Sequence, residues 1–226
     1  MMKRERRTLV RALDTEDQLG MELAVRFLEG AAKAVRDRGR FVVALSGGSV
    51  LRMLGMGLRQ ADLSGLDSSL WWICFADERM VSTTDGQRND RQAAEDLPFL
   101  RSVDPARVCS PQMHRDPEAS ARAYEQDLRK LFGGDLDGDG LPRFDLILLG
   151  MGADGHTASL FPGHRLLDLR GVWAGGLGDA PKPPPSRVTS RSLITRQSSQ
   201  SPSRSWPSAS SRIWSCAVWG RHRSSQ

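Results

Sequence analysis

The stretch FDLILLGMGADGHTASLFPGH, residues 144–164, contains the strongest structural signal in this chain. Its first part, Phe144 to Leu149, is an apolar run that is typical of a strand buried on both faces. The run ends in the glycine-rich loop 150–155, and His156 follows directly. Open α/β sheets bind ligands beyond the carboxyl ends of their strands. A histidine in this position can take a proton from water and return it, so His156 is a candidate catalytic residue.

Two other stretches have the same form, a buried strand followed by polar residues. Strand 41–45 is followed by Ser46, Gly47, Gly48 and Ser49, and strand 71–75 by Asp77, Glu78 and Arg79. The glycines let a ligand approach the backbone, and the helix start that follows them favours an anion, although a simple tight turn has the same pattern. An arginine can bind a phosphate through two parallel hydrogen bonds, but a surface ion pair is the commoner fate of such a triplet.

Helical patterns alternate with these strands. Residues 15–38 have apolar side chains at every fourth position, with Thr15 and Gln18 as a capping box and Gly39 as a stop. Further helices are predicted over 50–60, near 91–100, and from Asp116-Pro117-Glu118 to Phe132. This alternation predicts a single α/β domain with a doubly wound, mostly parallel sheet and helices on both faces.

Four motifs together resemble those of the 6-phosphogluconolactonase family. They are Leu45–Ser49, Phe75–Arg79, Gly150–Gly163 and Pro181–Thr189. The resemblance runs from about Leu13 to Thr189. It implies a Rossmann-like fold without a dinucleotide, and hydrolysis of 6-phospho-D-glucono-1,5-lactone to 6-phospho-D-gluconate in the oxidative pentose phosphate pathway. The implied partner is a small phosphorylated sugar lactone, and no cofactor is implied.

The resemblance also implies roles for single residues. His156 would be the general base that activates water, and Asp154 would orient either the imidazole or the substrate. Arg79 would hold the substrate phosphate, and Arg187 would contribute to the substrate site. The other expected substrate- or phosphate-binding residues are Ser46, Gly47, Gly48, Ser49, Asp77 and Gly152. Backbone N–H groups of loop 150–155 are expected to stabilise an oxyanion, Lys182 is expected to be solvated, and the alternative for His156 is a cap on the next helix.

Two other motif matches fail on their context. Gly150-x-Gly-x-x-Gly155 fits a dinucleotide fingerprint, but Pro162 and Gly163 leave no room for the long helix that should follow. Residues 135–140 imitate a calcium loop, but its twelfth position would be Leu146, inside a buried strand, where a glutamate is required. No Cys/His spacing suggests zinc. The sequence therefore predicts no metal and no cofactor.

Two alternative functions remain open. Glucosamine-6-phosphate deaminases are relatives that share the Asp-Gly-His and Asp-Glu elements, but after the histidine they usually read like Ile-Ala-Phe-Asn-Glu-Pro. This chain has TASLFP at 157–162, which favours the lactonase. The second alternative is a catalytically impaired or non-enzymatic phosphosugar-binding relative. The family's closing strands, and a phosphate-binding lysine on a glycine-rich turn, have no recognisable counterpart after Thr189.

Residues 190–226 differ in composition from the rest. Thirteen of these 37 residues are serine, and six are arginine, without any Asp, Glu or Lys. Subtracting those six charges from the total of +5 leaves −1 for residues 1–189, so the basic balance does not predict nucleic-acid binding. We expect a lactonase-like domain over 1–189, incomplete at its C-terminal end. The tail 190–226 is expected to be aberrant, through a frame slip or splicing error, or an ordinary disordered segment; RNA binding by it is a further alternative.

Cysteine usage and apolar runs bear on the compartment. The three cysteines are odd in number and scattered, which suggests a reducing, cytoplasmic setting rather than a disulfide framework. No run approaches the 18 apolar residues that a membrane helix needs, and the basic start lacks the apolar stretch of a secretory signal. We therefore expect no membrane partner and a monomeric protein.

Overall fold

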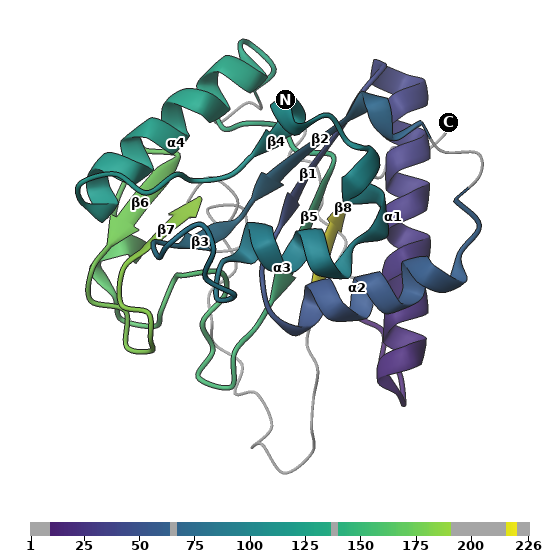
Figure 1. Ribbon diagram of the computed structural model, residues 1–226, viewed down its shortest axis with the longest axis horizontal. Helices are drawn as coiled ribbons and strands as arrows, with labels where there is room; N and C mark the ends of the chain where they lie inside the picture. Colours follow the sequence, from purple (N-terminus) through teal and green to yellow (C-terminus); the bar gives the residue numbers. More distant parts are fainter. Residues whose placement is uncertain (1–9, 64–66, 137–139, 191–215, 221–226) are drawn as a thin grey trace, which may run out of the picture.

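The computed structural model describes residues 10–63, 67–136, 140–190 and 216–220 (Figure 1). The α-helices are α1 (Glu16–Arg38), α2 (Ser49–Gln60), α3 (Asn89–Asp96) and α4 (Pro117–Phe132). The strands are β1 (Phe41–Leu45), β2 (Trp71–Phe75), β3 (Asp77–Arg79), β4 (Val108–Cys109), β5 (Leu146–Gly150), β6 (Ala174–Leu177), β7 (Arg187–Ser190) and β8 (Cys216–Gly220). Short 3-10 helices cover Ser68–Leu70, Pro98–Ser102, Pro105–Arg107 and Arg165–Leu167.

The main sheet has the strand order β4-β2-β1-β5-β8. Strands β4, β2, β1 and β5 are parallel, and β8 pairs antiparallel with β5. In this sheet β2 and β4 lie on one side of β1, and β5, which comes later in the sequence, lies on the other side. Because Leu45 lies beside both Phe75 and Leu148, the ends of the three central strands meet at the same edge. Polar residues that follow these strands are thereby brought together.

Both faces of the main sheet are covered, because its central strands are apolar on both sides. Along β1, Phe41, Val43 and Leu45 pack into one core with residues of α1, α2 and α3, whereas Val42 and Ala44 pack into a second core with residues of α4. Figure 1 shows α1 and α2 on one side of the sheet and α4 on the other. The predicted α/β class with a mainly parallel sheet is confirmed.

A second, antiparallel sheet of order β3-β7-β6 corrects the prediction of a single sheet. Asp77 pairs with Thr189 and Arg79 with Arg187, and the Ser190 N–H donates to the Ala76 carbonyl at 2.7 Å. Strands β6 and β7 have only four residues each, AGGL and RVTS, and neither shows the longer apolar run or alternation that identifies a strand in a sequence. Their structure depends on pairing across the chain, which a local pattern does not report.

Helix ends follow the predicted capping signals. Thr15 Oγ1 accepts a hydrogen bond from the Gln18 N–H at 3.2 Å, and α1 ends at Gly39, which has a left-handed φ of 70°. Asp116 caps α4 by accepting from the Ala119 N–H at 2.6 Å. The starts and ends predicted for these two helices are confirmed.

Helix α3 differs from its prediction near 91–100. It begins at Asn89 and ends at Asp96, and the chain then continues as a 3-10 helix over Pro98–Ser102. Leu97 has an extended conformation, with ψ of 105°. The α region is sterically disfavoured for the residue before a proline. Leu97 therefore leaves the helix, and Asp96 is the last residue of α3.

The tail contains one described segment, the strand β8. It pairs with the whole of β5, from Leu146 opposite Gly220 to Gly150 opposite Cys216. This strand was not expected from the sequence, and it forms where β5 would otherwise present an unpaired sheet edge. The predicted aberrant or disordered tail concerns mainly 191–215 and 221–226, which lie outside the described residues. The domain boundary at 189 stays a prediction.

Candidate active site

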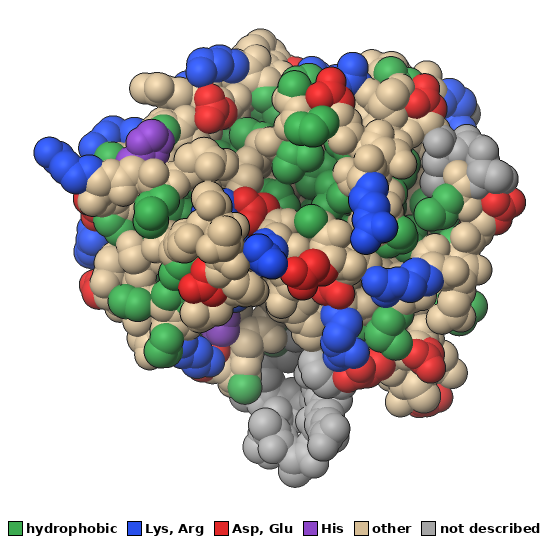
Figure 2. Space-filling view, viewed as in Figure 1, with side chains coloured by type: hydrophobic (Ala, Val, Ile, Leu, Met, Phe, Trp, Pro, Cys, Tyr) green, Lys and Arg blue, Asp and Glu red, His purple; other side chains and the backbone are tan. Residues whose placement is uncertain are grey.

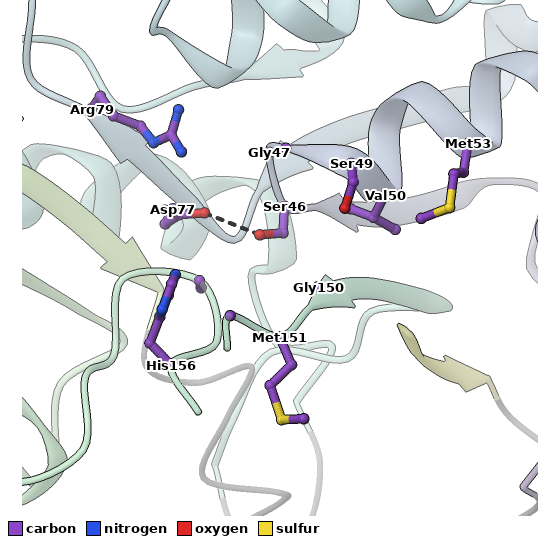
Figure 3. Close-up of a pocket in the computed structure, with 13 residues that line it drawn as sticks. Ser46, Gly47, Ser49, Val50, Met53, Asp77, Arg79, Gly150, Met151 and His156 are labelled. Carbon is purple, nitrogen blue, oxygen red and sulfur yellow. Dashed lines mark hydrogen bonds between the residues drawn. The ribbon is translucent and has the colours of Figure 1, made fainter. Parts of the chain in front are cut away.

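A cleft of about 210 Å³ lies at the carboxyl ends of β1 and β5, beside β3 (Figure 3). Ser46 directly follows β1, Asp77 begins β3 and Gly150 ends β5. Eight of the ten predicted site residues line this cleft: Ser46, Gly47, Gly48, Ser49, Asp77, Arg79, Gly152 and His156. The two others, Asp154 and Arg187, are not among the lining residues. The strand-end rule therefore located the cleft, whereas its substrate contacts stay a prediction.

The carboxylate of Asp77 connects three segments of the site. Its Oδ1 accepts hydrogen bonds from Ser46 Oγ and Asn89 Nδ2, both at 3.2 Å, and its Oδ2 accepts one from Ser159 Oγ at 2.7 Å. Asp77 is only 2% exposed. A buried carboxylate with this many donors fixes the turn after β1, the start of α3 and the loop after β5 relative to one another.

The turn between β1 and α2 brings a helix start into the cleft. Gly48 has φ of 83° and ψ of −152°, a conformation that only glycine adopts readily, and its N–H donates to Gln92 Oε1 at 2.8 Å. No side chain caps α2, and its first residues, Ser49 and Val50, line the cleft. The partial positive charge of this helix start favours an anion such as a phosphate.

His156 is held from two directions. Its Nδ1 lies 2.5 Å from Asp154 Oδ1, and its ring stacks on Phe161 with the ring centres 4.8 Å apart. Asp154 accepting from Nδ1–H selects the tautomer in which Nε2 carries no proton. Figure 3 shows the imidazole in the cleft with Asp77 and Arg79. This arrangement supplies an oriented base.

Lys182 is half exposed, in line with the expected solvation, and it also forms an ion pair that the sequence did not predict. Its Nζ lies 3.0 Å from Asp154 Oδ2, so the carboxylate is paired with His156 on one oxygen and Lys182 on the other. Partial burial opposes ionisation of Asp154, but the hydrogen bonds from His156 and Lys182 lower the pKa of its carboxyl well below the usual value. Asp154 is therefore ionised throughout the pH range in which the protein would work.

Gly152 makes room for this pair. A Cβ atom built at Gly152 would lie 2.2 Å from His156 Cε1 and 2.6 Å from Asp154 Oδ1. The Gly152 N–H donates to the His156 carbonyl at 2.8 Å, and the Gly155 N–H donates to the Gly152 carbonyl at 2.9 Å. These two amides shape the loop, so they are not free to be the predicted oxyanion donors.

We expect Gly152→Ala to lower the turnover number by about 10²-fold, because the added methyl must displace the imidazole. The fold should persist, since the clash involves the loop and not the core. Steady-state kinetics and thermal melting of the purified variant test this. Gly134→Ala is the matched control, because a Cβ there meets nothing within 4 Å. Unchanged turnover in Gly152→Ala would contradict the described imidazole position.

Arg79 borders the cleft on the side of β3. Its Nη1 donates to the Gln87 carbonyl at 2.6 Å, and its Nε is buried with no hydrogen-bond partner among the described residues. Its side chain is drawn beside the cleft in Figure 3. A guanidinium held by one backbone carbonyl retains other N–H groups that can bind an anion.

Arg187 lies deeper than the sequence suggested. It is 4% exposed, its Nη2 donates to the Lys182 carbonyl at 2.9 Å, and its guanidinium carbon lies 5.5 Å from the centre of the Phe161 ring. Burial, together with the charge of Arg79, lowers the pKa of Arg187. Arg187 thus packs against Phe161, which in turn stacks on His156, and direct contact with a substrate stays a prediction.

Glu78 anchors the start of α3 to β3. Its carboxylate is fully buried and accepts from the backbone N–H groups of Arg79 at 2.7 Å, Asn89 at 2.6 Å and Asp90 at 2.9 Å. Arg88 Nη2 lies 3.8 Å from its Oε2. Burial raises the pKa of Glu78 to about 7, although the backbone hydrogen bond from Asn89 opposes this shift.

This raised pKa predicts a pH-dependent stability. Glu78 titrates higher in the folded chain than when unfolded, so its contribution is fully present below about pH 4.5 and is lost as the pH rises through about 7. Relative to Glu78→Gln, the native chain should lose on the order of 2–3 kcal/mol of unfolding free energy between pH 4.5 and 7.5. Urea denaturation at several pH values measures this, with Glu29→Gln as an exposed control. Parallel pH curves for Glu78→Gln and the native chain would contradict it.

Sequence reasoning missed several residues that build the site. Ser159 and Phe161 lie in the glycine-rich motif, but only the fold turns them toward Asp77 and His156. Asn89 is fully buried and donates to the Asp77 carbonyl oxygen at 2.8 Å. A sequence motif can include such residues, but it does not indicate which way their side chains point.

On the face seen in Figure 2, basic and acidic side chains are interspersed. Within the described residues, no helix is both long and apolar enough to cross a membrane. In the same part of the chain, no group of three or more His, Cys, Asp or Glu side chains is arranged to hold a metal ion.

The fold and this cleft define an α/β protein with a candidate anion-binding site at the carboxyl ends of its parallel strands. The chain belongs to the family of glucosamine-6-phosphate isomerases and 6-phosphogluconolactonases, whose model matches residues 14–200. Within that family it groups with the 6-phosphogluconolactonases, as the motifs predicted. The matched region extends slightly past Thr189, where the resemblance of the motifs ends.

Individual relatives support this placement. The chain is 34% identical over 184 residues to the Arabidopsis thaliana protein named "Probable 6-phosphogluconolactonase 1", covering 80% of this chain and 69% of that protein. Its structure is similar to the 6-phosphogluconolactonase of Trypanosoma cruzi, with a TM-score of 0.68 and 28% identity over 79% of this chain and 72% of the other. The Shewanella baltica enzyme gives a TM-score of 0.65 and 27% identity, covering 81% and 75%.

Proposed function

We propose that this chain hydrolyses 6-phospho-D-glucono-1,5-lactone to 6-phospho-D-gluconate, with His156 as general base. The observation that carries the proposal is the Asp154–His156 pair, 2.5 Å apart, at a cleft that the start of α2 and Arg79 also border. One part of this site can activate water, and the other can hold a phosphate. Membership of the family supplies the substrate class.

In the proposed reaction, His156 Nδ1 keeps its proton toward Asp154 and Nε2 is the base. Nε2 removes a proton from water as the water oxygen bonds to C1 of the lactone, and the carbonyl oxygen becomes an oxyanion. When the carbonyl re-forms, the bond between C1 and the ring oxygen breaks, and Nε2–H gives its proton to that ring oxygen. The carboxylic acid product ionises at neutral pH, so each turnover releases one proton to solvent.

The phosphate of the substrate is proposed to bind at the start of α2 and to Arg79. Ser49 and Val50 present this helix start to the cleft, and Arg79 adds a full positive charge. Charge-assisted hydrogen bonds to a phosphate contribute about 1.5–3 kcal/mol each. Binding energy at the phosphate then places C1 near His156, which is the main requirement of a reaction that needs only a positioned water and a base.

The family model covers two activities, so the decisive experiment compares them. Purified chain is given freshly generated 6-phospho-D-glucono-1,5-lactone in a pH-stat, and separately glucosamine 6-phosphate with detection of ammonia. Proton release well above the spontaneous rate of the lactone, without ammonia, supports the proposal. Ammonia release would favour the deaminase, and the sequence 157–162 argues against that outcome. A folded chain without either activity would favour a binding-only relative.

A further inference from the structure

Lys182 is connected to the Asp154–His156 pair by two separate routes. The direct route is its Nζ, which lies 3.0 Å from Asp154 Oδ2, on the oxygen that His156 does not use. Lys182 belongs to the proline-rich segment between β6 and β7, 28 positions from Asp154 in the sequence. The contact therefore arises from the tertiary fold.

The second route runs through the backbone. The Lys182 carbonyl accepts from Arg187 Nη2 at 2.9 Å, and the Pro184 carbonyl accepts from Arg187 Nε at 2.9 Å. The buried guanidinium of Arg187 lies over Phe161, and Phe161 stacks on His156. The segment that carries Lys182 is thereby connected, through Arg187 and Phe161, to the same imidazole that Lys182 Nζ reaches through Asp154.

This arrangement has an electrostatic consequence for the base. An unpaired Asp154 carboxylate would favour the protonated, catalytically inactive imidazolium, whereas the adjacent ammonium offsets that negative charge. Binding of Oδ2 by Lys182 also leaves Oδ1 directed at Nδ1, which fixes the ring orientation and the tautomer. The other charged groups around His156 are Asp77 and Arg79, which line the same cleft, and Arg187, which packs against Phe161.

We propose that Lys182 is a positioning residue that keeps His156 oriented and unprotonated by binding Asp154. The inference rests on the proposed function, since the base matters only if the site activates water. It assigns to Lys182 a role through Asp154 and not a contact with the substrate phosphate. A phosphate anchor would act on KM, whereas a residue that controls the base acts on kcat and on its dependence on pH.

The test uses Lys182→Met, which keeps the length of the side chain and removes its charge, and Lys182→Arg, which restores a cation. For Lys182→Met we expect kcat at pH 7 to fall about 10-fold with KM within about twofold. The acidic limb of the pH–rate profile should move up by about half to one pH unit. Lys182→Arg should recover most of both effects. Lys130→Met, an exposed lysine on α4, is the matched control.

A second readout does not depend on turnover. The pH midpoint of the His156 Cε1–H resonance is followed by NMR without substrate, with His156→Ala to assign the signal, and it should rise in Lys182→Met by the same amount. If the His156 midpoint rises in Lys182→Met but the native chain has no lactonase activity, the proposed function is overturned and the role of the Lys182–Asp154 pair is retained. A raised KM with unchanged kcat and unchanged midpoint would show a phosphate anchor instead. No change in any measurement would show an ordinary surface ion pair, and either of these last results overturns the inference.

Discussion

Replacing His156 with alanine is expected to lower kcat for lactone hydrolysis by about 10²–10⁴-fold, the usual contribution of a general base. The imidazole lines the cleft, whereas Asp154, whose pKa is held well below the usual value, is a much weaker base. The variant should fold normally, because the side chain is at the surface of the loop and one fifth exposed. Initial rates of proton release, corrected for spontaneous hydrolysis, give the measurement.

The control for this variant is His164→Ala. His164 also pairs with a carboxylate, its Nε2 lying 3.1 Å from Asp179 Oδ1, but it does not line the cleft. Its loss should change kcat only a few-fold. Equal rates for His156→Ala and the native chain would remove His156 from the mechanism, whatever the effect of His164→Ala.

Replacing Asp77 with alanine is expected to lower the unfolding free energy by about 3–5 kcal/mol, the largest stability effect predicted for the site. Truncation leaves Ser46 Oγ, Asn89 Nδ2 and Ser159 Oγ without the acceptor that they share in a buried position. A domain has a margin of only about 5–15 kcal/mol, so the variant should unfold at a much lower urea concentration. Equilibrium urea denaturation measures the shift in midpoint.

Two further variants make the Asp77 result interpretable. Asp77→Asn keeps the shape and one acceptor oxygen, so it should lose about half as much stability as Asp77→Ala. Asp127→Ala removes a half-exposed carboxylate on α4 and should change stability by less than about 0.5 kcal/mol. If Asp77→Ala were as stable as Asp127→Ala, the carboxylate would not be the connecting group described above.

Much of the main layer of the fold could be predicted from local sequence. Strand β1 is an uninterrupted apolar run, and α1 and α4 begin at residues whose side chains cap them, so each signal lies within the element that it defines. Strands β6 and β7 carry no such signal. They are short, and their hydrogen bonds go to each other and to β3, so only the assembled chain identifies them.

The site was predictable to the same degree and for the same reason. Glycines after buried strands marked Ser46 to Ser49 and the loop before His156, because a sheet edge needs such turns to expose backbone. The ion pair of Lys182 was not predicted, since nothing near it in the sequence indicates a carboxylate 28 positions away. Arg187 was placed in the right region, but its burial against Phe161 depends on packing that no motif specifies.

The measurement that tests the account most directly is kcat/KM of the native chain for the 6-phosphorylated lactone and for the same lactone without phosphate. A site with a base at His156 and an anion site at α2 and Arg79 should turn over the phosphorylated substrate well above its spontaneous rate. Its kcat/KM should be higher for that substrate by about 10²-fold or more, because hydrogen bonds to a charged phosphate contribute about 1.5–3 kcal/mol each. A cooperatively folded chain that leaves both lactones at their spontaneous rates would contradict the assignment of this cleft as a lactonase site.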